Sequence, residues 1–241
     1  MATDDFYRNF SQVYDTVMDQ SLYDDWLAFT CRHIPNDTHS ILELACGSGE
    51  LSLRLDSAGF SVTGLDISDE MLILAQAKLP HQEFVLRDMR ELGNLGNFDA
   101  VTCYSDSLCY LSNLTEFQQV VEAVYDNLNN GGVFIFDVHS IYQMDEIFPG
   151  YSYHENAEDF AFLWDSFTDD DPHSIVHELT FFVKDGKGKF VRLDEVHHER
   201  TYEIKEYLSV LKKFNKVEVC ADFTDEKPNE KSARWFFVCQ K

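Results

Sequence analysis

The chain of 241 residues is 44% hydrophobic and 14% aromatic, which is typical of a globular protein with one large core. Its 43 acidic residues against 19 basic ones give a formal net charge of −24, which repels nucleic acid phosphates and anionic membrane surfaces. We therefore expect neither nucleic acid nor a membrane as a partner, and the acidic N-terminus, with no signal-peptide pattern or long apolar run, predicts a cytoplasmic location.

Residues 6–33 carry apolar side chains at helical spacing and are predicted to form two helical segments ahead of the first strand. Phe10 and Tyr14 belong to one apolar stripe, and Tyr23 and Trp26 lie in the second segment. The plainest interpretation is that these aromatic residues pack the helices onto the domain.

Residues 41–50 pass from an apolar strand directly into a glycine turn. A strand that is apolar on both faces is typical of a parallel sheet covered by helices. Gly47 and Gly49 permit positive φ and bring backbone N–H groups at a helix N-terminus toward a ligand. A dinucleotide-binding turn has the pattern G-x-G-x-x-G, but its last position here is Ser52, so the fit to NAD is poor.

The next two predicted strands are each followed closely by a carboxylate. Residues 61–66 end at Asp66, 17 residues after the second glycine of the turn, where a carboxylate can accept two hydrogen bonds from a ribose diol. Ser68 is the expected N-cap of the following helix. Residues 83–86 form a short third strand, and Asp88 follows it.

The alternation of strands and helices then continues. Residues 98–103 form the fourth strand, and Thr115 with Gln118 predicts a capping box at the start of the next helix. Residues 133–138 form the fifth strand, and His139 lies just beyond its end. These strand ends are where open α/β sheets bind ligands.

Between residues 140 and 200 the pattern changes to four β-rich runs without a convincing helix. A glycine-containing turn at residues 185–188 joins the last two runs, so we expect a small antiparallel sheet inserted into the domain. A helix at 204–214 and strands at 217–223 and 234–239 are predicted to complete the chain.

Glu43, three spacer residues and Gly47-x-Gly49, with Asp66 and Asp88 in register downstream, resemble the motifs of the class I S-adenosylmethionine-dependent methyltransferases. The resemblance implies an α/β fold with a doubly wound, Rossmann-like sheet. That sheet has seven mostly parallel strands with an antiparallel last strand, and the inserted antiparallel sheet is added to it.

The same resemblance implies how the chain is divided and what it binds. The cofactor would be S-adenosylmethionine and the acceptor a small molecule. The methyltransferase domain would comprise residues 1–140 and 201–241, with 1–33 as a helical lid over the cofactor and 141–200 as the inserted subdomain. The implied cofactor contacts are Tyr14, Tyr23, Glu43, Ala45, Gly47, Gly49, Asp66, Ile67, Met71, Asp88, Met89 and Tyr104.

Within the family, the aromatic lid, the inserted sheet and the run Arg200-Thr201-Tyr202 are similar to small-molecule N- or O-methyltransferases, including sugar-amine N,N-dimethyltransferases. Those sugar enzymes have a histidine where this chain has Tyr110, which argues against a sugar amine as the acceptor.

In-line displacement from a sulfonium requires mainly positioning and the exclusion of water. His139 and Tyr110 are the candidates for positioning the acceptor or for accepting its proton. His197 and His198 are further candidates, and at most one of them faces the site because neighbours on a strand point to opposite faces. The six cysteines include no C-x-x-C pair, so we expect core thiols and no metal site.

Two questions stay open at this point. The inserted sheet either walls the acceptor side, with Tyr151, His154 and Trp164 as lining, or forms a homodimer interface. Two other functions also remain as alternatives: an NAD-dependent oxidoreductase, and a domain that binds the cofactor without turnover and acts through a protein partner.

Overall fold

The structure is a computed structural model that describes residue 17 and residues 19–241. Tyr14 and the first part of the predicted lid lie outside the described residues. The second predicted helical segment is helix α2 (Gln20–His33), which begins after an N-cap at Asp19, whose side chain accepts a hydrogen bond from the backbone N–H of Ser21. Among the described residues, no helix combines the length and apolar character needed to span a membrane.

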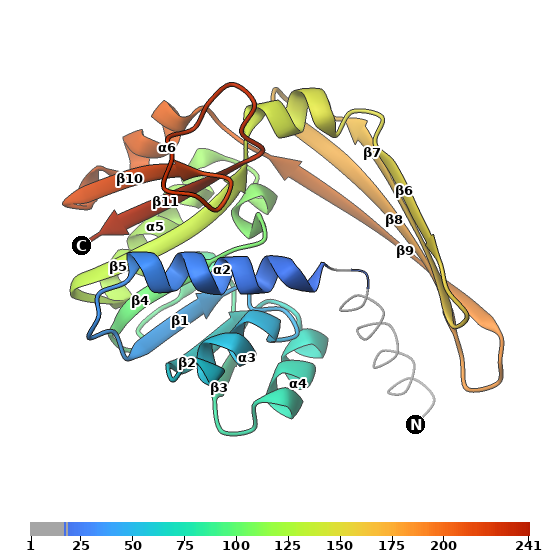
Figure 1. The fold of residues 1–241 in the computed structure, drawn as a ribbon, viewed down its shortest axis with the longest axis horizontal. Helices are drawn as coiled ribbons and strands as arrows, with labels where there is room; N and C mark the ends of the chain where they lie inside the picture. Colours follow the sequence, from blue (N-terminus) through green and yellow to red (C-terminus); the bar gives the residue numbers. More distant parts are fainter. Residues whose placement is uncertain (1–16, 18) are drawn as a thin grey trace.

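Seven strands form the main sheet in the order β10-β11-β5-β4-β1-β2-β3 (Figure 1). Strands β1 to β5 are parallel, whereas β11 runs antiparallel to β5. This topology confirms the predicted fold class. The strands are β1 (Ser40–Leu44), β2 (Ser61–Asp66), β3 (Glu83–Leu86), β4 (Phe98–Cys103), β5 (Leu128–His139), β10 (Lys216–Ala221) and β11 (Arg234–Gln240).

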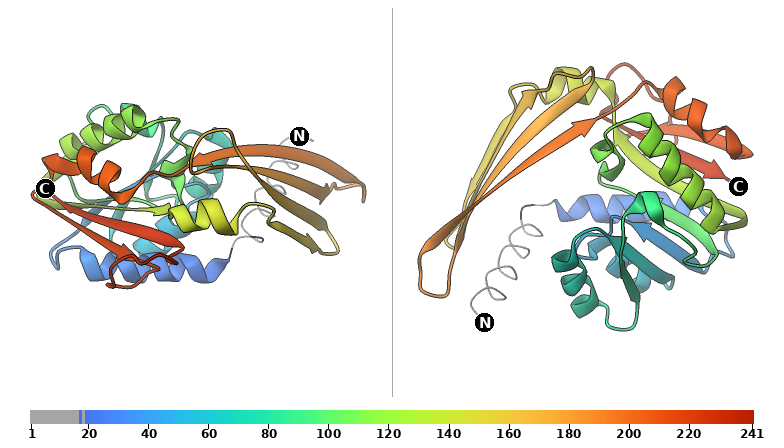
Figure 2. Two further views of the ribbon diagram at one scale, coloured as in Figure 1. Left: turned by 90° about the horizontal axis from the view of Figure 1, so that it is seen from above. Right: turned by 180° about the vertical axis from the view of Figure 1, so that it is seen from behind.

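Helices cover both faces of this sheet (Figure 2). One buried cluster joins the sheet to α5 and α6, and a second joins the opposite face to α2 and α3. The sheet strands therefore bury both faces, which explains their nearly continuous apolar runs. The remaining helices are α3 (Glu50–Ser57), α4 (Asp69–Lys78), α5 (Leu114–Asn127) and α6 (Ile204–Val210), with short helical turns η1 (Met89–Glu91), η2 (Ser107–Tyr110) and η4 (Leu211–Lys213).

The helix starts agree only partly with prediction. Ser68 is the N-cap of α4, and its hydroxyl oxygen accepts from the backbone N–H of Met71 at 3.2 Å. The predicted capping box at Thr115 is wrong, because Asn113 is the N-cap of α5 and its side chain accepts from the N–H groups of Thr115 and Glu116. Asparagine competes well for this position, and its earlier place in the chain starts the helix sooner.

A second sheet, in the order β6-β7-β8-β9, is inserted between β5 and α6 and extends away from the main sheet as a long twisted arm (Figure 1). Its strands are antiparallel, as predicted: β6 (Ser152–Asn156), β7 (Phe160–Thr168), β8 (Ser174–Lys184) and β9 (Phe190–Arg200). The arm has a small core of its own, made of Phe160, Phe162, Phe181 and Val183.

The prediction that residues 140–200 contain no helix is wrong. A short helical segment, η3 (Gln143–Ile147), connects β5 to the arm. Its Met144 is buried in the core of the main domain. A segment of this length is too short to show helical periodicity, so tertiary packing rather than local pattern stabilises it.

Candidate functional site

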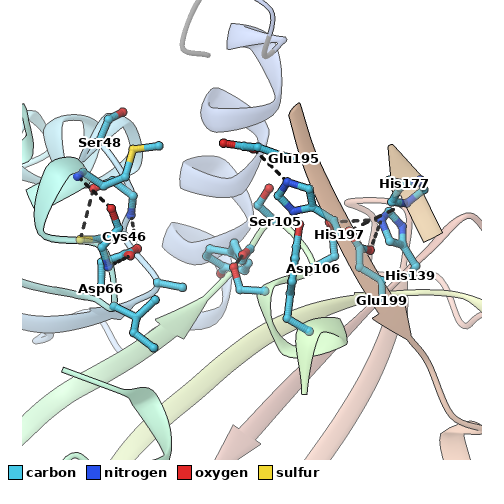
Figure 3. A pocket seen from close by; sticks show the side chains of 18 of the residues that line it. Cys46, Ser48, Asp66, Ser105, Asp106, His139, His177, Glu195, His197 and Glu199 are labelled. Carbon is cyan, nitrogen blue, oxygen red and sulfur yellow. Dashed lines mark hydrogen bonds and ion pairs between the residues drawn. The ribbon is translucent and has the colours of Figure 1, made fainter. Parts of the chain in front are cut away.

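A cavity of about 1440 Å³ lies between the carboxyl ends of the main-sheet strands and the arm (Figure 3). The glycine turn and Asp66 lie on one side, His139, His177 and Glu199 lie on the other, and Ser105 and Asp106 lie between them. The structure brings most of the predicted site residues to this cavity. Its lining includes Tyr23, Glu43, Ala45, Gly47, Asp66, Ile67, Met71, Asp88, Met89, Tyr104, Tyr110 and His139.

Gly47 and Gly49 have different structural roles. Gly47 lines the cavity with φ of +53°, and a Cβ at this position would meet nothing within 4 Å. Gly49 does not line the cavity; it is the N-cap of α3 with φ of +81°, and a Cβ there would lie 3.0 Å from the Cβ of Ala75 on α4. The second glycine is therefore required by helix packing and by backbone conformation.

Asp66 ends β2 and holds the glycine turn to it. Its Oδ2 accepts from the backbone N–H of Gly47 at 2.8 Å, and its Oδ1 accepts from the backbone N–H of Ser68 at 2.9 Å. A carboxylate has about four lone-pair directions, so two remain for a ligand on the cavity side.

Glu43 is almost completely buried beneath the turn and accepts a hydrogen bond from the hydroxyl of Ser52. Burial raises its pKa to about 8, although the Ser52 hydrogen bond acts in the opposite direction. Ser52 occupies the position of the third glycine in a dinucleotide-binding turn. Its side chain serves here as the partner of a buried acid, which explains the departure from the dinucleotide pattern.

Asp88 and Met89 lie at the start of η1, beyond the end of β3. The carboxylate of Asp88 accepts from the backbone N–H of Arg90 at 2.8 Å and from its guanidinium at 2.6 Å. The hydrogen bond from the Arg90 side chain is the main cause that lowers the pKa of Asp88. The acid is therefore held as a carboxylate at the cavity wall.

On the arm side, a buried cluster of charged groups surrounds His139, the last residue of β5. The Nε2 of His139 lies 3.2 Å from Asp106 Oδ2 and 3.7 Å from Glu199 Oε2. Arg234 donates to Asp106 Oδ1 at 2.6 Å and to Asp137 Oδ2 at 2.7 Å. Three buried or largely buried carboxylates thus share one guanidinium and one imidazole.

The pKa of each acid in this cluster depends on its burial and on the charged groups beside it. Burial acts to raise the pKa of Asp106, but the charges of His139 and Arg234 outweigh burial and hold it well below its usual range. Burial raises the pKa of Glu199 well above its usual range. Burial also raises the pKa of Asp137, which accepts a further hydrogen bond from the indole N–H of Trp26 at 2.8 Å.

His177 on β8 presents a fixed hydrogen-bond donor to the cavity. The indole N–H of Trp164 donates to its Nδ1 at 3.0 Å, and the hydroxyl of Ser166 lies 2.7 Å from the same nitrogen. Burial lowers the pKa of His177 to about 4, so the ring is neutral at physiological pH. Because an indole can only donate, Nδ1 is the acceptor and Nε2 carries the proton.

Tyr110 and His197 form a polar pair at the cavity wall. The Tyr110 hydroxyl lies 2.9 Å from His197 Nδ1, and Glu195 lies 3.0 Å from His197 Nε2. His198 points to the opposite face of β9, where it contacts Asp169. Only His197 of this pair lines the cavity, as strand alternation predicted.

The arm contributes an aromatic wall that includes Tyr151 and Trp164, as predicted, and also Tyr153. The prediction for His154 is wrong, because this exposed residue does not line the cavity. Tyr153 precedes it on β6, and successive side chains on a strand point to opposite faces.

Sequence reasoning missed Asp106, Glu199 and Arg234 as site residues. Glu195, His197 and Glu199 alternate along β9 and all line the cavity. Polar residues at period two in a strand that otherwise faces an apolar core were a signal that could have identified this face.

Comparisons with known proteins identify the family of the chain. A methyltransferase domain family matches residues 41–132. "Putative methyltransferase GWCH70_2453" of Geobacillus sp. (strain WCH70) is 42% identical and covers 98% of this chain and 99% of its own length. The "dTDP-3-amino-3,6-dideoxy-alpha-D-glucopyranose N,N-dimethyltransferase" of Streptomyces fradiae is 30% identical over 53% of this chain and 49% of its own.

Among solved structures, an S-adenosylmethionine-dependent methyltransferase from Clostridium acetobutylicum ATCC 824 is similar over 97% of this chain and 98% of its own, with a TM-score of 0.83 and 26% identity. Streptomyces venezuelae DesVI shares the fold over 98% of both chains, with a TM-score of 0.78 and 23% identity. The near full-length relative, the domain match and the glycine turn with its two downstream carboxylates together show that the chain belongs to the S-adenosylmethionine-dependent methyltransferase family.

Proposed function

We propose that the protein transfers a methyl group from S-adenosylmethionine to a nitrogen or oxygen atom of a small molecule bound in the same cavity. The observation that carries this proposal is the size and two-sided lining of the cavity. Pockets for a single drug-sized ligand measure about 300–1,000 Å³, and this cavity of about 1440 Å³ exceeds that range. It has room for a cofactor against the glycine turn and an acceptor against the arm.

The residues on the glycine-turn side fit the cofactor. The two free lone-pair directions of Asp66 suit a ribose diol, and the open space at Gly47 admits a ligand close to the backbone. We assign Asp88 and Met89 to the adenine and the region of Glu43 to the methionine part. The proposed contacts are Tyr23, Glu43, Ala45, Gly47, Asp66, Ile67, Met71, Asp88, Met89 and Tyr104, with Gly49 acting through the turn.

When bound, S-adenosylmethionine supplies a methyl group on a sulfonium for in-line displacement. The protein's own residues orient the acceptor and exclude water, which supplies much of the acceleration of such a reaction. The aromatic wall of the arm, with Tyr151 and Trp164, excludes water on the acceptor side. Tyr110 and His139 position the acceptor, and His197 can take a proton through Tyr110 at 2.9 Å.

The acceptor class follows from the arm side of the cavity. Its mixture of aromatic rings, carboxylates and histidines suits a small molecule with an apolar body and a polar group at the reacting atom. The partial match to a sugar-amine N,N-dimethyltransferase supports a nitrogen acceptor. Tyr110, which stands where such enzymes have a histidine, favours a different amine or hydroxyl compound.

Calorimetry with the purified protein tests the cofactor half of the proposal. Asp66→Ala should weaken S-adenosylmethionine binding by about 1.5–3 kcal/mol through the loss of charge-assisted hydrogen bonds. Asp69→Ala is the matched control, because Asp69 is an exposed carboxylate three residues away. Unchanged affinity in Asp66→Ala, or tighter binding of NAD than of S-adenosylmethionine by the wild type, contradicts the assignment.

A turnover assay tests whether the protein transfers the methyl group to a small-molecule acceptor. A metabolite extract incubated with the protein and methyl-labelled cofactor should yield a labelled product detected by mass. Cofactor binding without any labelled product would support the alternative of a binding domain that acts through a partner. Trp164→Ala should reduce turnover with little effect on cofactor affinity. If it instead changes only the oligomeric state, the arm is the homodimer interface that the sequence left open.

A further inference from the structure

In-line methyl transfer does not by itself require the cluster of one imidazole and two carboxyl groups formed by His139, Asp106 and Glu199. One oxygen or nitrogen atom from each of these three side chains lies within 4.8 Å of the other two. Each residue comes from a different segment: η2 begins just after Asp106, β5 ends at His139, and Glu199 lies on β9. We propose that these three side chains bind one divalent metal ion at the acceptor end of the cavity.

Two of the three spacings between the candidate ligand atoms match those around a metal ion, and the third, between Asp106 and Glu199, is within 4.8 Å. Zinc and similar ions bind nitrogen and oxygen at about 2.0–2.2 Å, so neighbouring ligand atoms of one ion lie roughly 3–4 Å apart. His139 Nε2 lies 3.2 Å from Asp106 Oδ2 and 3.7 Å from Glu199 Oε2. One imidazole and two carboxylates form a donor set suited to Mn²⁺, Fe²⁺ or Zn²⁺.

A second observation that supports a metal ion, independent of the ligand spacing, comes from Glu199. Its carboxylate is 5% exposed, and its Oε2 atom, the one that faces His139, has no hydrogen-bond partner among the described residues. A buried carboxylate oxygen without a donor is costly to the folded protein. Tyr110 is a hydrogen-bond partner of the Glu199 side chain and acts to lower the pKa of Glu199, so the unpartnered atom is Oε2 alone. A metal ion between Glu199, His139 and Asp106 would give Oε2 a partner.

The charged groups around the cluster also favour a bound cation. Arg234 contacts Oδ1 of Asp106 and so orients Oδ2 toward His139, as outer-shell groups orient metal ligands. Arg234 is shared between Asp106 and Asp137 and is not paired with Glu199. Among the described residues, the ion-pair contacts of Glu199 are the imidazoles of His139 at 3.7 Å and His177 at 3.9 Å. A divalent ion would bring a full positive charge to Glu199.

His177 does not belong to the ligand set. Its Nε2 lies 3.9 Å from Glu199 Oε1 but carries a proton, because its Nδ1 accepts from Trp164. The protonated Nε2 of His177 therefore faces Glu199 Oε1 beyond direct hydrogen-bond distance and offers no lone pair to a metal ion. With a metal ion on its Nε2, His139 serves as a ligand, and proton transfer from the acceptor falls to Tyr110 and His197.

Metal binding can be measured without knowing the acceptor. The tag-free full chain is treated with a chelator, dialysed and titrated with Mn²⁺ in about 0.15 M salt, which screens the acidic surface. Electron paramagnetic resonance counts free Mn²⁺, and calorimetry gives affinity and stoichiometry. We expect one ion per chain, and Glu199→Gln should weaken its binding at least about 10- to 100-fold, the loss seen even for outer-shell changes.

Glu195→Gln is the matched control, because Glu195 lies on the same strand and lines the same cavity. It should bind Mn²⁺ as the wild type does. Circular dichroism and melting temperature show whether Glu199→Gln folds, and His139→Asn replaces it if it does not. The proposal is overturned if the wild type binds no ion, or if the folded ligand variant binds as tightly as the wild type. S-adenosylmethionine affinity is measured in parallel, so a failed metal site is distinguished from a failed cofactor site.

Discussion

Replacing Glu43 with glutamine should make the stability of the protein less dependent on pH between mildly acidic and neutral conditions. Burial raises the pKa of Glu43 from 4.5 to about 8, so the folded state keeps this side chain protonated where the unfolded chain ionises it. Between these two values the folded state binds one more proton than the unfolded state, and the stability of the wild type therefore falls as pH rises. Each pH unit in that window costs about 1.4 kcal/mol.

From pH 5.5 to pH 7.5 this difference amounts to about 2–3 kcal/mol. Glutamine has the same shape and can still accept the hydrogen bond from Ser52, but it does not titrate. Urea unfolding of both proteins without cofactor at the two pH values isolates the contribution of Glu43, because all other groups titrate alike. Glu83→Gln, an exposed position on β3, is the control and should follow the wild type. Parallel pH dependence of the wild type and Glu43→Gln would refute the reasoning.

Two further substitutions test the packing around the site. Gly49→Ala should lower the free energy of unfolding by about 2–4 kcal/mol, because φ is +81° and the new methyl group would lie 3.0 Å from the Ala75 side chain on α4. Gly47→Ala has open space around the new methyl group and should lower it by only about 1 kcal/mol. Equal losses for the two variants in denaturant unfolding would contradict this distinction. Trp26→Phe removes the donor to a buried carboxylate and should cost about 1–3 kcal/mol. The control is Trp235→Phe, which removes an indole N–H that has no partner among the described residues and should cost less; thermal unfolding that ranks the two in the opposite order would count against the hydrogen bond.

The glycine-turn side of the cavity could be predicted from sequence because its parts are close together along the chain. Glu43, Gly47 and Gly49 belong to one strand–turn–helix unit, and Asp66 ends the next strand. Parallel strands in an open α/β sheet bring their carboxyl ends to one edge, so a strand pattern is enough to place these residues together. The alternating runs at 140–200 predicted the inserted sheet for the same reason, since strand periodicity is a local property.

The arm side of the cavity depended on the tertiary structure. Arg234 lies opposite His139 because β11 pairs antiparallel with β5, and Glu199 reaches the same point at the end of the inserted sheet. Neither pairing is encoded in local periodicity, because an apolar run does not specify which strand edge it joins or in what register. Asp106 lies between Tyr104 and Tyr110, which were both predicted as site residues, but its side-chain partners His139, Glu199 and Arg234 and its backbone partner Asp137 are 31 or more residues away along the chain. The sequence by itself thus determined the fold class and the glycine-turn side of the cavity, while only the packing of the arm onto the main sheet decided which charged groups meet on the opposite side.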